Sequence, residues 1–357
     1  MKRLSLSKLV IAAFALVLLP AAALAEPPLK VVRIASVAVF TDGKSEITGG
    51  QSAVLAGNRW LQDELKKHGV ALEWYPVPTS VGGPAFNEAL AKGAIDFASY
   101  GDFPAIIARS GGIDIKLIVP SGRGMNSYLV VPVDSPAQSI EDLKGKRVSI
   151  HRGRPLELTF NQLVQSKNLK YNDFKLLNVA SHAGASALAA GNIDALFTGS
   201  DAYLLQDKGV GRIIWSSKGT DWKWRAELFV RREFAEKYPE ITQIVANAYV
   251  RAGHWSAQEE NRDTVIDLGT RIGTPRNVVE RDFTDESVDW KDRWSPLFDA
   301  YAIDHYRDAI AFTREQNLIR REFPVEDLFE RRFLETALKQ LRLESYWQPR
   351  PAVAAMH

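Results

Sequence analysis

Short apolar segments alternate with amphipathic segments over the first two thirds of the chain. Residues 31–35, 115–119 and 148–150 are mostly apolar, short and rich in β-branched side chains, which predicts buried strands. In residues 52–67 and 155–167 the apolar positions recur at helical spacing, which predicts amphipathic helices. This alternation indicates an α/β fold with largely parallel sheets. By the same criteria, further strands are expected at residues 72–77, 128–131, 174–179 and 227–230.

The last third of the chain has a different pattern. Apolar residues keep a helical period and strand signals are few, in residues 240–258, 274–283, 294–316 and 325–343. We therefore expect these helices to complete and brace the lobe formed by the N-terminal part of the chain.

One phrase occurs twice, as ALAKGAID at residues 89–96 and ALAAGNID at residues 187–194. Each copy predicts the end of a helix, a glycine cap, a short buried strand and then a polar loop. Ligands of open α/β sheets bind beyond the carboxyl ends of the strands. The repeat therefore predicts two similar α/β lobes, each contributing a loop to a shared cleft; the alternative is a chance likeness between two helix–strand connections.

The first 25 residues have the features of a secretory signal peptide. Lys2, Arg3 and Lys8 precede an apolar run at residues 9–19, and an Ala-x-Ala sequence ends at residue 25. That run is too short to span a bilayer, and no later stretch approaches the roughly 20 apolar residues that a membrane helix needs. We expect a mature protein that begins near Glu26 and resides in the periplasm.

Composition excludes several classes of function. The chain has no cysteine, so disulfides, thiolate catalysis and cysteine-based metal sites are excluded. The formal net charge is +2, and loss of the three basic residues of the signal segment would bring it to −1, which gives no reason to expect nucleic acid. Neither a complete phosphate-binding glycine motif nor a metal-ligand spacing of histidines is present. No catalytic residue, metal or cofactor is therefore predicted.

Three segments resemble the periplasmic binding proteins of the nitrate/sulfonate/taurine ABC-importer family. They are residues 93–104 with Gly-Ala-Ile-Asp-Phe and Gly-Asp-x-Pro, residues 134–148 with Asp-Ser-Pro and Asp-Leu-Lys-Gly-Lys-Arg-Val, and residues 229–240. The sequence departs from the family where residues 198–201 form a polar loop in place of the usual tryptophans.

This resemblance implies a type II periplasmic-binding-protein fold with two α/β lobes joined by a two-strand hinge. The lobes would be residues 26–125 with 225–357 and residues 126–224. The implied function is capture of a small anionic or zwitterionic organosulfur solute, such as an aliphatic sulfonate or taurine. A monomeric protein would then deliver this solute to an inner-membrane permease. Two alternatives stay open: an enzyme on the same scaffold, like thiamine-pyrimidine synthases or menaquinone-pathway enzymes, and a binding protein for nitrate or an aromatic solute.

Two loops are the main candidates for holding the solute. Ser99, Tyr100 and Gly101 precede a helix opened by Pro104, and Arg152, Gly153 and Arg154 precede one opened by Pro155. Free backbone N–H groups at such helix starts, with two guanidinium groups, suit an anion. Other candidate ligand contacts follow predicted strands or lie near the lobe crossings: Thr41, Asp42, Gly43, Asp102, Asn126, Ser127, His182, Thr198, Asp201 and Trp222.

Several of these candidates have a second interpretation. Asp102 and Asp201 could pair with the ammonium end of a zwitterion or could cap the helices that follow them. Arg152 and Arg154 could be exposed loop charges. Trp222 and its neighbour Trp224 could form a wall for the carbon stem of a ligand or could pack the hinge.

Overall fold

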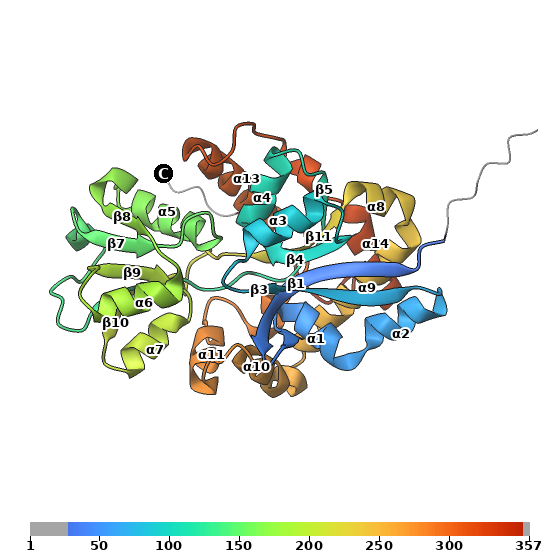
Figure 1. The fold of residues 1–357 in the computed structure, drawn as a ribbon, viewed down its shortest axis with the longest axis horizontal. Helices are drawn as coiled ribbons and strands as arrows, with labels where there is room; N and C mark the ends of the chain where they lie inside the picture. Colours follow the sequence, from blue (N-terminus) through green and yellow to red (C-terminus); the bar gives the residue numbers. More distant parts are fainter. Residues whose placement is uncertain (1–27, 353–357) are drawn as a thin grey trace, which may run out of the picture.

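The computed structural model describes residues 28–352, which form two lobes with one sheet each (Figure 1). Strands from both ends of the chain build the first sheet, and strands from the middle build the second. Within the described range no helix combines the length and apolar character that a membrane span requires. The expected signal peptide, residues 1–25, lies outside the described residues.

The first sheet contains six strands, which are β1 (Val31–Thr41), β2 (Lys44–Ile47), β3 (Ala71–Pro78), β4 (Phe97–Gly101), β5 (Ile115–Pro120) and β11 (Ala226–Arg231). β1 lies parallel to β3 on one side and to β4 on the other. Its last four residues extend beyond β4 and pair with β2 as an antiparallel hairpin. β11 returns from the second lobe and lies antiparallel between β4 and β5.

Eleven α-helices belong to the first lobe: α1 (Gly50–Asn58), α2 (Trp60–Lys67), α3 (Gly83–Ala91), α4 (Asp102–Ser110), α8 (Arg232–Lys237), α9 (Pro239–Ala257), α10 (Arg262–Thr270), α11 (Arg276–Phe283), α12 (Trp290–Arg293), α13 (Ala300–Glu315) and α14 (Arg331–Leu341), all within residues 28–352. Short 3-10 turns occur at Glu259–Asn261 and Val325–Leu328. As expected, the last third of the chain forms helices, α8 to α14. Several of these helices pack on the first sheet (Figure 1).

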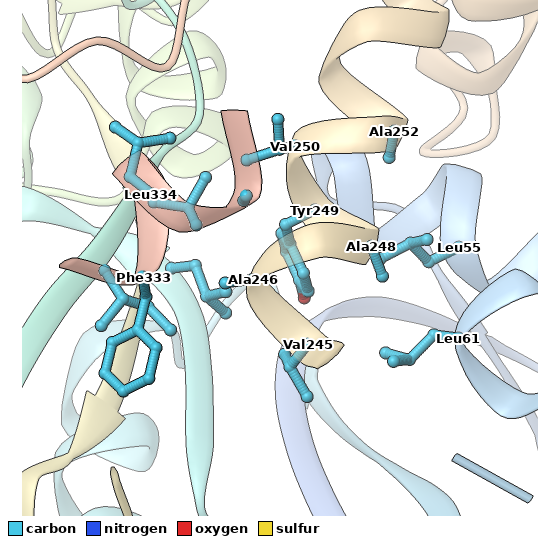
Figure 2. Packing of buried hydrophobic residues seen from close by; sticks show 14 of the residues in the cluster. Leu55, Leu61, Val245, Ala246, Ala248, Tyr249, Val250, Ala252, Phe333 and Leu334 are labelled. Atoms are coloured by element: carbon cyan, nitrogen blue, oxygen red, sulfur yellow. The ribbon is translucent and has the colours of Figure 1, made fainter. Parts of the chain in front are cut away.

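Helix α9 is at the centre of the first core (Figure 2). Leu55 and Leu61 pack on one side of it, and Phe333 and Leu334 of α14 pack on the other. Tyr249 lies between them and is 1% exposed, and its hydroxyl is 2.7 Å from Ser52 Oγ in α1. This contact between Tyr249 and Ser52 fixes the position of the first turn of α1.

The second sheet contains five strands in the order β10-β6-β9-β7-β8, which are β6 (Tyr128–Pro132), β7 (Arg147–Ile150), β8 (Lys175–Asn178), β9 (Ala195–Thr198) and β10 (Gly211–Ser216). Its helices are α5 (Leu156–Ser166), α6 (Ser181–Ala189) and α7 (Asp201–Asp207), with 3-10 turns at Glu141–Leu143 and Tyr171–Asp173. β7 lies parallel to both β8 and β9, whereas β6 and β10 are antiparallel to their neighbours.

Two extended segments connect the lobes. The chain leaves the first lobe after β5 and returns through the segment that precedes β11. Met125 and Trp224 pair across these segments through two backbone hydrogen bonds of 2.8 and 3.2 Å. The connection is therefore a two-stranded, antiparallel link of the kind expected from the resemblance.

The repeated phrase has the same structural role in both lobes. Gly93 and Gly191 both adopt a positive φ, of 64° and 72°, just after a helix. Asp96 Oδ2 accepts the N–H of Arg33 at 2.9 Å, and Asp194 Oδ2 accepts the N–H of Arg147 at 2.8 Å. Each aspartate thus ties the start of its strand to the neighbouring parallel strand, which explains why the repeat keeps its register.

The helix expected over residues 52–67 is two helices, α1 and α2. They are separated at Arg59, which has a left-handed φ of 61°. Gly57 and Asn58 directly precede this break, and both residue types have low helix propensity. Strands β2 and β10 were not among the expected strands.

Candidate ligand-binding cleft

A cavity of about 380 Å³ lies between the lobes beside the two connecting segments. The first lobe and the connections supply most of its lining, and the second lobe contributes Arg154 and Pro155. Four helices begin at this cavity, α1, α3 and α4 from the first lobe and α5 from the second.

The starts of these helices offer backbone donors to the cavity. Their N-cap residues, Gly49, Gly82, Gly101 and Pro155, all line it, and none makes a side-chain capping bond. The first N–H groups of a helix have no partner within the helix and carry the positive end of its dipole. Their convergence favours an anion.

Arg154 crosses from the second lobe to the first. Its Nη2 donates to the carbonyl oxygens of Ser80 at 3.2 Å and Val81 at 3.0 Å. The guanidinium lies against Gly82, where an added Cβ would be 1.7 Å from Nη1, and the positive φ of 56° at this position favours glycine. Partial burial lowers the pKa of Arg154, and the carbonyls of Ser80 and Val81 accept its hydrogen bonds without compensating its charge.

Two further arginines line the cavity from deeper positions. Arg225 is 1% exposed, and its Nε donates to Glu227 Oε1 at 2.6 Å. Burial disfavours its charge, but the Glu227 carboxylate outweighs burial and raises the pKa of Arg225. Arg293 Nη2 donates to the carbonyl of Phe283 at 2.8 Å.

Three buried donor groups in the lining have no protein partner. They are Arg225 Nη1, Arg293 Nε and Trp294 Nε1. Buried donors are normally hydrogen-bonded, so these three groups are unused hydrogen-bonding capacity in residues that line the cavity.

Aromatic and aliphatic side chains form the rest of the wall. Phe86 and Tyr100 stack with ring centroids 4.9 Å apart, and Phe283 packs edge-on against Trp294 at 6.1 Å. Trp224 also lines the cavity, and its Nε1 donates to the carbonyl of Asn126 at 3.0 Å. Ile272, 51% exposed, lies at the cavity from the loop between α10 and α11.

Asp102 supports the cavity floor from behind. Its carboxylate accepts the N–H of Phe103 at 2.6 Å and that of Arg225 at 3.2 Å, and His305 Nε2 lies 2.6 Å from Oδ2. Asp102 is 1% exposed and does not line the cavity. Asp102 instead joins α4, α13 and the return segment before β11, which agrees with the alternative that it supports the following helix.

The first predicted loop is placed at the cavity. Ser99, Tyr100 and Gly101 all line it, and the structure places them in the last part of β4 rather than in a loop after it. Of the second loop only Arg154 does so. Arg152 Nε donates to Glu157 Oε1 at 2.9 Å, and the N–H of Gly153 donates to Glu157 Oε2 at 2.6 Å, so both serve the start of α5.

The remaining candidates after predicted strands lie elsewhere. Thr41, Asp42 and Gly43 form the tip of the β1–β2 hairpin, because β1 continues beyond the edge at which the cavity lies. Thr198 and Asp201, which end β9 and begin α7, are not in the lining either. The second copy of the repeat therefore does not bring its loop to this cavity.

The candidates near the crossings serve the connection between the lobes. Asn126 donates to the carbonyl of Asp282 and accepts from Lys223, and the N–H of Ser127 donates to Ser217 Oγ. Trp222 stacks on Trp215 with centroids 6.3 Å apart, outside the cavity lining. His182 lies in the first turn of α6, and its side chain is outside the described part of the structure.

Sequence reasoning missed several lining residues. Gly49-Gly50 and Gly82-Gly83 are glycine pairs directly before helices, a signal that was available in the sequence. Arg225, Arg293 and Trp294 have no local motif, since they reach the cavity only when the return strand and the C-terminal helices close over it.

The chain matches a family model described as "NMT1/THI5 like" over residues 66–261. One similar solved structure is described as a "putative sulfonate ABC transporter, periplasmic sulfonate-binding protein" from Methylobacillus flagellatus KT. It has a TM-score of 0.85 and 42% sequence identity, and the match covers 92% of this chain and 99% of that one.

Two similar curated proteins come from Escherichia coli (strain K12). The "Putative aliphatic sulfonates-binding protein" is 26% identical over 213 residues, which cover 58% of this chain and 64% of the relative. The "Taurine-binding periplasmic protein" is 24% identical over 226 residues, which cover 60% of this chain and 68% of the relative. The matches thus span about two thirds of the length of each relative.

Proposed function

The chain belongs to the NMT1/THI5-like family, and on that premise we propose that it is a periplasmic protein that captures an organosulfonate for an ABC importer. The resemblance inferred from residues 93–104, 134–148 and 229–240 is confirmed, and so is the fold of two α/β lobes joined by two strands. Similar proteins are named for binding sulfonates or taurine, which supports this class of solute.

The charge of the cavity lining is the observation that carries the proposal. All of its charged side chains, in the described range, are arginines: Arg154, Arg225 and Arg293. Glu227 compensates the charge of Arg225, so Arg154 and Arg293 carry the argument from charge. Four helix starts add backbone donors to the same space. A sulfonate offers three acceptor oxygens and a permanent negative charge, so it can satisfy both kinds of donor. A charge-assisted hydrogen bond contributes roughly 1.5–3 kcal/mol.

The expected compartment supports the same role. Residues 1–25 would direct the chain to the periplasm, and related proteins are named as periplasmic. The loaded protein would then meet a permease in the inner membrane. We expect osmotic shock to release a monomer whose first residue is Glu26 or a close neighbour. Recovery only with membranes, or an intact Met1 in the cell, would contradict this assignment.

The proposed protein binds its solute without converting it. The similar proteins reported above favour this, since they are named as binding proteins. An enzyme on the same scaffold is the competing class. The two differ in one observable: a binding protein returns its solute unchanged.

A thermal-shift screen of the mature protein tests the proposal directly. The panel holds alkanesulfonates, taurine, aromatic sulfonates, nitrate, sulfate and pyrimidines. A true solute at 100 times its dissociation constant stabilises the protein by about 2.7 kcal/mol. Mass spectrometry of the recovered solute then separates binding from turnover. If no sulfonate raises the melting temperature, the proposed function is wrong; a response to nitrate or pyrimidines alone would identify another ligand class.

A further inference from the structure

Resting on the proposed function, we propose that the solute is a sulfonate with an apolar body of aromatic size and no ammonium end. The inference depends on three features of the same cavity: the sign of its charges, the side chains of its walls and its volume.

The charges of the lining disfavour a zwitterion. An ammonium group needs a carboxylate or several carbonyl acceptors when it is removed from water. Yet the described lining residues include no aspartate or glutamate. Two acids behind the wall are committed elsewhere: Glu227 binds Arg225 and the N–H of Ser121, and Asp102 binds His305. Their side chains are at most 1% exposed. A taurine ammonium would therefore lie among arginines without a carboxylate of the lining as its counter-charge.

The walls suit a carbon body instead. Phe86, Met125, Trp224, Ile272, Phe283 and Trp294 present apolar or aromatic surface. Phe283 and Trp294 come from the C-terminal segment that closes over the cavity, which is a different part of the chain from the helix starts around Arg154. A flat ring can pack edge-on or offset against such side chains.

The volume fits a body larger than two carbons. The cavity holds about 380 Å³, within the range of roughly 300–1,000 Å³ found for drug-sized ligands. A two-carbon aminosulfonate would leave most of this space to water against apolar walls. Each methylene buried there is worth about 0.8 kcal/mol, so affinity should rise about fourfold per added carbon until the cavity is full.

Calorimetry on a matched series of sulfonates provides the test. 1-Propanesulfonate and taurine have nearly the same shape, a methyl group in one replacing the ammonium in the other. We expect taurine to bind at least tenfold more weakly than 1-propanesulfonate, and benzenesulfonate and naphthalene-2-sulfonate to bind more tightly than either. Taurine binding as tightly as 1-propanesulfonate, or affinity independent of body size, would overturn the inference while leaving the proposed function intact.

The outcomes of that series separate this inference from the proposed function. If none of the sulfonates binds, the proposed function itself fails. If naphthalene-2-methanol, which lacks the charge, binds as tightly as naphthalene-2-sulfonate, the anionic head group is wrong.

Two variants locate the apolar wall. Ile272 is half exposed, so Ile272→Ser should fold normally and weaken naphthalene-2-sulfonate several-fold while changing ethanesulfonate little. Val133→Ser is the matched control, since Val133 is 57% exposed and lies outside the cavity. Phe283→Leu should weaken the aromatic solutes and spare 1-propanesulfonate. Equal losses for both solutes in Ile272→Ser and Phe283→Leu would contradict an aromatic-sized site.

Discussion

Arg152 and Arg154 are two residues apart in one loop, yet their surroundings differ. Arg152 pairs with Glu157 in the helix that follows the loop, whereas Arg154 reaches across the cleft to two carbonyl oxygens and lines the cavity. A guanidinium whose charge is compensated contributes little to holding an anion. Of the two, only Arg154 has the geometry of a ligand contact.

Replacing Arg154 tests this difference. We expect Arg154→Ala to weaken sulfonate binding by roughly 1.5–3 kcal/mol, about ten- to a hundredfold, because a charged donor is lost. Arg152→Ala should leave affinity within about threefold, since it lies outside the cavity. Calorimetry on both variants gives the answer, and equal losses would show that the whole loop holds the solute.

Two ion pairs, one at the connection and one between the lobes, differ in how deeply they are buried. Lys223 and Asp285 join the connection to the C-terminal segment at 2.8 Å, with side chains 3% and 1% exposed. Burial opposes ionisation of Asp285, but its hydrogen bonds from Lys223 and Ser287 hold its pKa well below the usual value. Arg281 and Asp207 join the lobes at 2.6 Å and are about one third exposed.

Burial should decide the cost of breaking these pairs. Asp285→Asn leaves Lys223 buried without its counter-charge, so we expect a loss of roughly 3–5 kcal/mol of unfolding free energy at pH 7. Arg281→Ala should cost less than about 1 kcal/mol, because that pair is partly solvated. Urea denaturation measures both, and similar losses would contradict the ranking.

The buried pair of Lys223 and Asp285 predicts that the free energy of unfolding depends on pH. A carboxyl whose folded pKa is depressed stabilises the fold above its unfolded pKa of about 3.9, and this contribution falls as pH drops toward the folded pKa. The free-energy difference between wild type and Asp285→Asn should therefore be constant from about pH 5 to 7 and shrink below about pH 4. A difference that stays constant down to pH 3 would show that Asp285 is not the stabilising carboxylate.

At the scale of elements, the cavity is formed by the starts of four helices, and close approach between them depends on small residues. Gly101, the N-cap of α4, faces Pro155 of the second lobe so closely that an added Cβ would be 2.5 Å from its Cγ. The backbone of Gly101, with φ of −64° and ψ of 149°, is one that any residue can adopt. An alanine here would obstruct contact between the lobes without straining α4.

Gly101→Ala should therefore separate closure from folding. We expect near-normal stability without solute, but at least tenfold weaker binding, because Pro155 cannot reach its place. Gly199→Ala is the control, since its Cβ would meet nothing within 4 Å. Thermal melts and calorimetry measure the two effects; unchanged affinity would mean that the lobes need not meet at this point.

At the scale of the whole molecule, the lobes touch on both sides of their connection (Figure 1). Arg154 contacts the carbonyl oxygens of residues 80 and 81, and α11 contacts α7 through Arg281 and Asp207. These contacts hold the two lobes together beside the cavity. Hinge motion about residues 121–127 and 217–225 would separate the lobes and widen access to it.

Small-angle scattering should detect that motion. We expect the radius of gyration to fall when a saturating sulfonate is added, because the solute binds donors of both lobes at once. Arg154→Ala should reduce this change at the same solute occupancy. Identical scattering with and without solute would argue against a movement of the second lobe, residues 126–224, relative to the rest of the protein.

Local sequence patterns determined the features of the fold that depend on residues close together in the chain. The alternation of strands and helices gave the α/β class, and the repeat located two equivalent strand starts, because glycine caps and aspartate ties act over a few residues. The segment Ser99–Gly101 could be found in the same way, since it lies at the end of a strand and directly precedes a helix. The motifs that carry the family resemblance are likewise continuous in sequence.

Tertiary structure alone decided which of these positions face the cavity. β1 runs on into a hairpin and carries Thr41–Gly43 away from the cavity, an outcome set by pairing with β2 rather than by the residues of the loop. Asp102 turned inward because His305, some 200 positions along the chain, lies 2.6 Å from it. Arg225, Arg293 and Trp294 line the cavity only because the chain crosses between the lobes twice and then folds its last third over the first lobe. Contacts between residues so far apart in sequence leave no periodic signal, so the unpaired donors of the site became visible only in the folded molecule.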